Sequence, residues 1–148
     1  MNEQQIIDLI GVRPPYLWID TVTELTDDRI VCTKELSADL EIFSVHYDGF
    51  PLFPGALQCE ACFQASNVLL TRLLPENPGH LPVIARVRDV KFKKLVRPDS
   101  VLTVEVSLDD RESKAIFLSG VCKVDGAITT SLKFIATEAP VGEESATG

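Results

Sequence analysis

The chain has 148 residues and a mass of 16.3 kDa, which is enough for one domain with its own hydrophobic core. Hydrophobic residues make up 45% and charged residues 24%, an ordinary globular composition that argues against general disorder. The formal net charge is −8, so the chain should repel nucleic acids and anionic membranes. We expect one acidic domain over residues 1–138 and a polar, frayed tail over residues 139–148.

The first residues, MNEQQIIDLIG, lack a basic segment and a sustained apolar run, so they do not resemble a secretory signal. The longest uncharged apolar stretch, residues 49–59, contains two prolines. It is also shorter than the roughly 18 residues that a membrane-spanning helix needs. We therefore expect a cytoplasmic protein without membrane association, whose cysteines stay reduced.

The first part of the chain predicts a short helix and two strands. Residues 2–10 place their isoleucines and a leucine on one side of a helix, which ends before Pro14-Pro15. Residues 17–25 and 29–36 have the composition of two strands joined by a short turn. The following residues, 39–55, are predicted to be irregular because they contain several aromatic residues, prolines and glycines.

A long helix is predicted over residues 56–74, and a proline-rich loop over residues 75–82. Apolar residues occur on nearly all sides of the helix, which is typical of a helix buried in a core. One polar line remains, at spacings of i, i+4, i+7 and i+11. It consists of Glu60, Gln64, Asn67 and Thr71.

The second half of the chain predicts an antiparallel sheet. β-branched residues are frequent in four segments, residues 83–92, 101–108, 116–124 and 127–137. Asp125-Gly126 lies between the last two and is a strong hairpin signal, because a two-residue turn needs positive φ angles. The pattern predicts an α+β fold in which the sheet packs on one buried helix.

His46 and Glu60 are candidates for acid–base chemistry. His46 precedes the buried helix, and Glu60 lies on its polar line. A neutral imidazole and a carboxyl group whose pKa is raised by apolar surroundings can exchange protons near neutral pH. The helix start at Gly55 adds free N–H groups that can polarise a carbonyl oxygen. These groups suit proton abstraction next to a carbonyl and loss of a leaving group, but on their own they are more typical of a surface histidine and a solvated helix stripe.

The stretch HYDGFPLFPGALQCEACFQA, residues 46–65, resembles the signature of the 3-hydroxyacyl-acyl-carrier-protein dehydratases of the FabZ type. In that family a His opens the motif, a Pro-x-x-Pro-Gly follows, and a Glu lies fourteen residues after the His. This chain has the same register at His46, Pro51, Pro54, Gly55 and Glu60.

The resemblance covers roughly residues 10–137. Arg13, Pro15 and Asp20 match the opening Arg-Tyr-Pro-Phe…Asp segment of the family. The run VKFKKLVRP, residues 90–98, is similar to the Arg-Phe-Lys-Arg-Pro…Pro strand, and VDG, residues 124–126, to the last hairpin.

The resemblance implies the hot-dog fold, in which an antiparallel sheet wraps around one long central helix. Family members form dimers, often three dimers to a hexamer, with the active site between two subunits. His46 of one subunit would take the proton next to the thioester carbonyl, and Glu60 of the other would protonate the departing β-hydroxyl group. A backbone N–H at the helix start would hold the thioester oxygen, and a glutamine would orient the carboxyl group. The implied substrate-binding residues are Gly55, Gln64, Pro54 and Phe53.

The implied product is a trans-2-enoyl thioester, formed without a metal or redox cofactor. The implied partner is acyl carrier protein with its phosphopantetheine-linked substrate, and the acyl chain would lie in an apolar tunnel beside the helix. A basic segment could dock the acidic carrier, or it could be the solvated face of an edge strand. Its residues are Arg86, Arg88, Lys91, Lys93, Lys94 and Arg97, with Lys94 on the opposite face from Lys91 and Lys93.

The chain departs from the family pattern around the histidine and in the basic segment. Val45 and Asp48 replace a glycine and a proline, Leu95 replaces a proline, and Ser100 replaces an aspartate. Asp48 would favour protonated His46 if it faced the site, and would cost little if it faced water. These changes leave open both fatty acid synthesis and a more specialised lipid or polyene pathway.

Two other functions stay open: a hot-dog thioesterase that hydrolyses the thioester, and a non-catalytic module that binds acyl groups or their carrier. Cys59 and Cys62 lie within the helix without a second cysteine pair, so we expect core residues rather than metal ligands. His80, in the proline-rich loop, is expected to be exposed to solvent.

Overall fold

The computed structural model describes residues 1–141. Helix α1, Glu3–Ile10, begins with a capping box in which Asn2 and Gln5 each accept a hydrogen bond from the other's backbone N–H, both at 2.9 Å. It ends at Gly11, whose φ of 71° closes the helix in the left-handed region. The short N-terminal helix is therefore confirmed.

Six strands form one antiparallel sheet in the order β1-β2-β4-β5-β6-β3, so β1 and β3 are the two edges. The strands are β1 Thr21–Leu25, β2 Arg29–Leu36, β3 His80–Phe92, β4 Ser100–Glu112, β5 Ala115–Val124 and β6 Ala127–Pro140. Asp125 and Gly126 form the predicted hairpin between β5 and β6, with φ angles of 51° and 77°.

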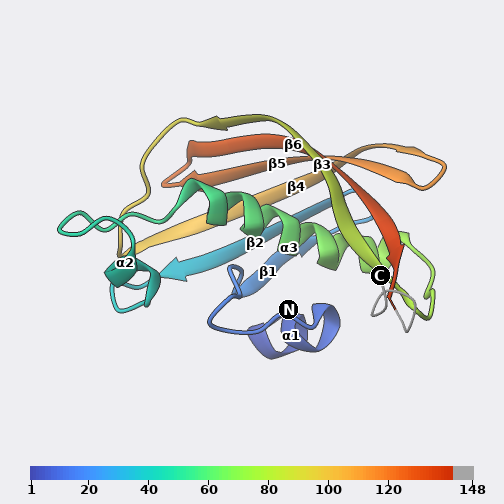
Figure 1. The fold of residues 1–148 in the computed structure, drawn as a ribbon, viewed down its shortest axis with the longest axis horizontal. Coiled ribbons are helices and arrows are strands. Elements are labelled where there is room, and N and C mark those ends of the chain that lie inside the picture. The colour runs from blue at the N-terminus through green and yellow to red at the C-terminus, as the bar shows by residue number, and fades with distance from the viewer. Residues whose placement is uncertain (142–148) are drawn as a thin grey trace.

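The long helix α3, Gly55–Leu73, lies in the curve of the sheet, which wraps around it (Figure 1). Its inward side chains join those of the strands in one hydrophobic core. One close approach is at Gly120 of β5, where an added Cβ would lie 2.9 Å from the Cys62 sulfur. This arrangement is the predicted hot-dog fold.

Several predicted segments differ from the structure. The proline-rich loop expected over residues 75–82 ends earlier, because residues 80–82 already pair with β6 as the start of β3. The strand expected from residue 17 begins only at Thr21, because the Trp18 N–H donates to the Gln64 side chain instead of joining a strand ladder. The segment expected to be irregular contains a one-turn helix, α2, Ile42–Val45.

The predicted tail also begins later than expected. β6 continues through Pro140, so Ala139 and Pro140 pair with Leu81 and His80 of β3. Residues 142–148 of that predicted tail lie outside the described residues.

The two helical cysteines, Cys59 and Cys62, are buried in the core as predicted. Cys62 lies 3.7 Å, sulfur to sulfur, from Cys122 of β5. In the part of the chain that the structure describes, no helix has both the length and the apolar character needed to cross a membrane.

Candidate active site

His46 follows the last residue of α2 and is half-buried. Its Nδ1 lies 3.1 Å from the carbonyl oxygen of Leu52. Because a carbonyl oxygen only accepts, Nδ1 carries the proton of this hydrogen bond, and in the neutral imidazole the lone pair is then on Nε2. Nε2 is therefore the atom of His46 that can accept a proton from a substrate.

The loop after His46 is fixed by turns and by an arginine. Tyr47 and Gly49 adopt positive φ angles of 56° and 76°, which bend the chain sharply. The Arg97 guanidinium donates to the Pro51 carbonyl at 2.9 Å and stacks 3.9 Å from the centre of the Phe50 ring. Arg97, predicted as a docking residue, thus supports the loop that carries the histidine.

Asp48 is exposed to solvent. Within residues 1–141 it makes no hydrogen bond or ion pair with His46. Its position matches the expectation for a carboxylate that faces water rather than the imidazole.

Glu60 is half-buried on the polar line of α3. Burial raises the pKa of its carboxyl group, and a hydrogen bond from the Gln64 side chain lowers the pKa in part. The net upward shift favours the protonated carboxyl group, which is the form that can give a proton to a leaving group.

Gln64 is fully buried and contacts three groups at once. Its Nε2 lies 2.8 Å from the Tyr16 carbonyl oxygen and 3.3 Å from Glu60 Oε1, and its Oε1 accepts from the Trp18 N–H at 2.7 Å. The amide therefore joins the segment before β1 to the carboxyl group on α3. The sequence predicted the contact with Glu60 but gave no signal for the contacts with Tyr16 and Trp18.

The start of α3 presents free backbone donors. The Pro54 carbonyl accepts from the N–H groups of Leu57 and Gln58, both at 3.1 Å. The N–H groups of Gly55 and Ala56 precede these bonds and have no partner within the helix. They are the donors that a carbonyl oxygen of a ligand could meet.

Gly55 has a second role at this helix start. A Cβ at this position would lie 2.5 Å from Cε1 of Phe92, so the absence of a side chain lets that ring pack over the first turn. The Phe53 ring, predicted to bind substrate, is buried against Trp18 with ring centres 5.4 Å apart. It belongs to the core beneath the loop.

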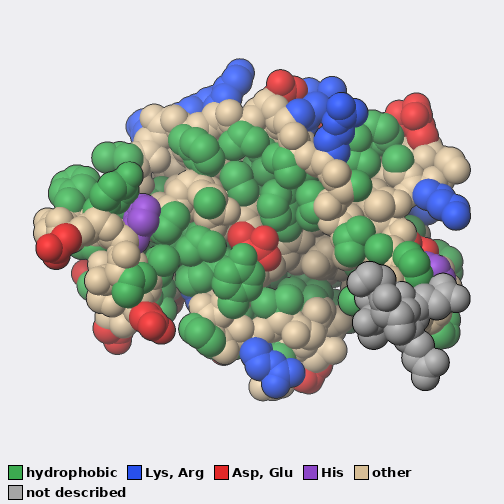
Figure 2. Space-filling view, in the orientation of Figure 1, with side chains coloured by type: hydrophobic (Ala, Val, Ile, Leu, Met, Phe, Trp, Pro, Cys, Tyr) green, Lys and Arg blue, Asp and Glu red, His purple; other side chains and the backbone are tan. Residues whose placement is uncertain are grey.

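The structure does not bring all predicted groups together in one chain. Within residues 1–141, no hydrogen bond joins His46 to Glu60. Arg86, Arg88 and Lys91 are exposed on the edge strand β3, and Lys93 is exposed just after it. Figure 2 shows Lys and Arg side chains along the border of the molecule where β3 and β6 lie.

The sequence did not predict one polar network, which joins α3 to β6. Gln58 faces the sheet rather than the polar line, and its Oε1 accepts from the hydroxyl groups of Thr129 and Thr130 at 2.8 and 2.7 Å. These bonds tie the first turns of α3 to β6. Since Gln58 stands alone among apolar neighbours in the sequence, its pattern gave no signal for this role.

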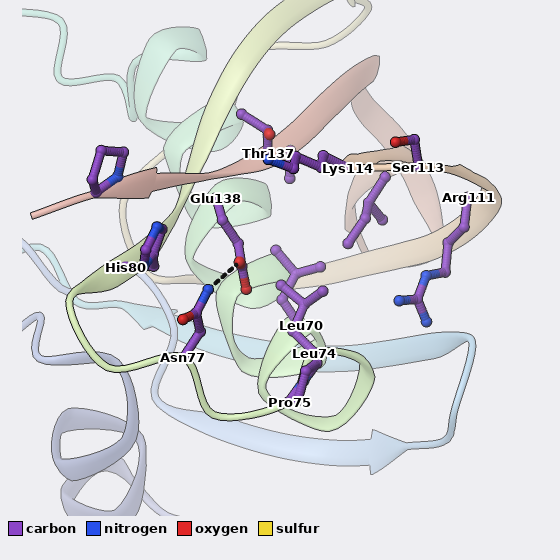
Figure 3. A pocket seen from close by; sticks show the side chains of 13 residues that line it. Leu70, Leu74, Pro75, Asn77, His80, Arg111, Ser113, Lys114, Thr137 and Glu138 are labelled. Atoms are coloured by element: carbon purple, nitrogen blue, oxygen red, sulfur yellow. Dashed lines mark hydrogen bonds between the residues drawn. The ribbon is translucent and has the colours of Figure 1, made fainter.

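A cavity of about 450 Å³ lies at the other end of α3 (Figure 3). Leu70 and Leu74 line its apolar side, and Asn77 donates to Glu138 across it at 3.0 Å. His80 also lines this cavity and is exposed, as predicted. Neither His46 nor Glu60 borders it, so the cavity is separate from the candidate active site.

Metal-binding side chains do not converge in the described region. In residues 1–141, no group of three His, Cys, Asp or Glu side chains is arranged to hold a metal ion.

Known proteins resemble the chain in sequence and in fold. It is 33% identical over 86% of its length to the "3-hydroxyacyl-[acyl-carrier-protein] dehydratase FabZ" of Lactococcus lactis subsp. cremoris, covering 88% of that protein. It is 30% identical over 91% of its length to the FabZ of Thermotoga neapolitana, covering 96% of it.

The solved structures share the fold. "The Dehydratase Heterocomplex ApeI:P from Xenorhabdus doucetiae" superposes with a TM-score of 0.74 at 16% identity, over 96% of this chain and 94% of the other. A hypothetical thioesterase from Streptococcus pneumoniae, solved with coenzyme A, has a TM-score of 0.65 at 14% identity, over 82% and 86%. The FabA-like domain matches residues 12–133, which contain both His46 and Glu60, and the chain belongs to this family.

Proposed function

We propose that the protein dehydrates 3-hydroxyacyl thioesters to trans-2-enoyl thioesters, in fatty acid synthesis or a related pathway. The observation that carries this proposal is a pair of side chains with complementary roles, one able to donate a proton and the other able to accept one. Glu60 has a carboxyl group whose burial raises its pKa, and His46 has an Nε2 left free by the hydrogen bond at Nδ1. The FabZ relatives, at about 30% identity over most of the chain, support the same reaction.

The proposed step moves two protons. His46 Nε2 takes the proton from the carbon next to the thioester carbonyl. The electron pair of that C–H bond forms the double bond, the bond from the β-carbon to its oxygen breaks, and Glu60 protonates the leaving hydroxyl group to give water. The N–H of Gly55 holds the thioester oxygen while negative charge develops on it. Proton return from His46 to Glu60 through solvent restores the starting state.

A second copy of the chain is proposed to complete the site, with His46 of one subunit facing Glu60 of the other. Two features support this arrangement. His46 and Glu60 do not meet within one chain, and β3 is an edge strand whose outer backbone groups can pair with another strand. Val87 and Phe92 expose 42% and 62% of their surface on this strand, which gives a partner apolar area to cover.

The proposed substrate carrier is acyl carrier protein. Positive charge on and beside β3, at Arg86, Arg88, Lys91 and Lys93, favours an acidic partner although the chain itself has a net charge of −8. A cytoplasmic location fits the four cysteines, all of which are unpaired and buried.

The test is turnover of 3-hydroxyacyl thioesters on acyl carrier protein and on coenzyme A, followed by enoyl absorbance and product mass. We expect water loss in the wild type and a decrease of about 10²- to 10⁴-fold in kcat for His46→Ala and for Glu60→Gln. His80→Ala, which changes the other histidine, is the matched control and should keep full activity.

Product mass separates the rival functions. Release of free acid with the β-hydroxyl group intact would identify a thioesterase. Tight binding of the thioester without any product would identify a binding module. Either result would overturn the proposed dehydration.

A further inference from the structure

Tyr16 lies at the border between the core and solvent, just before the first strand. Its ring meets the Trp18 ring edge-on, with centres 6.0 Å apart and planes at 72°, while half of the residue, 51%, stays exposed. Within the described residues its hydroxyl group makes no hydrogen bond. The contact with Trp18 thus holds the ring, while the hydroxyl group on it is available to bind a ligand.

The backbone of Tyr16 is tied directly to the Glu60 side chain. Gln64 Nε2 donates to the Tyr16 carbonyl at 2.8 Å and contacts Glu60 Oε1 at 3.3 Å. The neighbouring Trp18 N–H donates to the other end of the same amide. One buried side chain therefore sets the position of the Tyr16 backbone relative to the candidate acid.

The electrostatic state of the phenol agrees with this placement. Burial raises the pKa of Tyr16, and the negative charge of Glu60 raises it further. The phenol therefore keeps its proton at neutral pH and can act as a hydrogen-bond donor.

The hydroxyl group adds nothing to the contact with Trp18, which a phenyl ring alone would make, and half of the residue is open to solvent or to a ligand.

We propose that the Tyr16 phenol contacts the substrate beside Glu60 and donates a hydrogen bond to the β-hydroxyl oxygen. This inference rests on the proposed dehydration. The β-hydroxyl oxygen has two lone pairs, so it can accept from Tyr16 and take the proton from Glu60 at the same time. Tyr16 then selects thioesters that carry an oxygen at the β-carbon over thioesters that do not.

The variant Tyr16→Phe removes only the hydroxyl group. We expect kcat/KM for the 3-hydroxyacyl thioester to fall about 3- to 10-fold, as for the loss of one neutral hydrogen bond. The inhibition constant of the saturated acyl thioester of equal length, which lacks the β-oxygen, should stay unchanged. If Tyr16 had a purely structural role, Tyr16→Phe would weaken binding of both thioesters by the same factor.

Binding measured in the His46→Ala background keeps this test separate from turnover. In that background, Tyr16→Phe should weaken binding of the 3-hydroxyacyl thioester about 3- to 10-fold relative to binding of the saturated thioester. This ratio of dissociation constants is measured without any turnover. If wild type makes no enoyl product but the ratio shifts, the proposed dehydration fails and the contact stands. An unchanged ratio, or an equal loss for both thioesters, would overturn the role of Tyr16.

Discussion

Glu60 and Gln64, four residues apart on α3, show how one helical turn prepares a candidate acid. Gln64 is buried and hydrogen bonded at both ends of its amide, so it is held in one orientation. Glu60 lies next to it, partly withdrawn from water, with its pKa raised. When such a partly buried carboxyl group ionises, the folded state becomes less stable, because it then holds a poorly solvated charge.

Glu60→Gln should therefore stabilise the protein in a pH-dependent way. The folded pKa of Glu60 lies above its unfolded value, so the folded state binds more protons and stability decreases as pH rises through the interval between the two values. The variant should have a larger free energy of unfolding than wild type at pH 8. This difference should vanish below pH 4.5, the ordinary pKa of a glutamate carboxyl group.

Urea unfolding of both proteins at pH 8 and pH 4 measures this difference, with the exposed Glu76→Gln as the control. A gain in stability that is equal at both pH values would contradict the assigned cause.

At this scale the sequence predicted the shared helix face of Glu60 and Gln64 better than the bonds that hold Gln64 in place. The spacing of Glu60 and Gln64 predicted one face of a helix, and the structure confirms their contact. The bonds from Gln64 to Tyr16 and Trp18 span 48 and 46 residues. Contacts over such separations depend on how the segments pack, which periodicity does not encode.

At the scale of elements, α3 packs directly against the backbone of β5 at Gly120, which has no side chain. An added Cβ at Gly120 would lie 2.9 Å from Cys62 Sγ and 3.1 Å from Leu132 Cδ2, both in the core. Such distances are too short for ordinary contacts, so any larger residue must displace the helix or the neighbouring strand.

Gly120→Ala should destabilise the fold by about 1–3 kcal/mol through overpacking, as measured by urea or thermal unfolding. A double-mutant cycle with Cys62→Ala tests the cause, because removing the sulfur should return part of the lost stability. No loss in the single variant, or strict additivity of the two changes, would contradict this close approach.

Element types were predictable because their apolar patterns are long and regular. The limits of α3 were predicted within one residue, and β2 was predicted at its observed limits, Arg29–Leu36. The failures have physical causes: residues 17–19 are buried in succession without strand pairing, and α2 is a single turn amid turn-forming residues. β4 extends to Glu112 on exposed charged residues, which carry no strand pattern of their own.

At the scale of the whole molecule, the two proposed catalytic side chains are held by different parts of the chain. His46 is held by its own loop through Leu52 and Arg97 supports that loop, while Glu60 is held by Gln64 on α3. Figure 2 shows apolar side chains over much of the face around a group of acidic atoms, and a histidine at each end of that face. An apolar face of this kind, next to an edge strand, is suited to contact with a second copy.

The central claim is that His46 of one subunit and Glu60 of another form one dehydratase site. The most direct measurement is the dehydratase activity of His46→Ala and Glu60→Gln chains that are co-expressed and purified together. Random pairing makes half of the dimers mixed, and each mixed dimer has one intact site of two, so about a quarter of wild-type activity should return. If the mixture stays as inactive as each variant alone, although mass spectrometry shows mixed dimers, the shared site is contradicted.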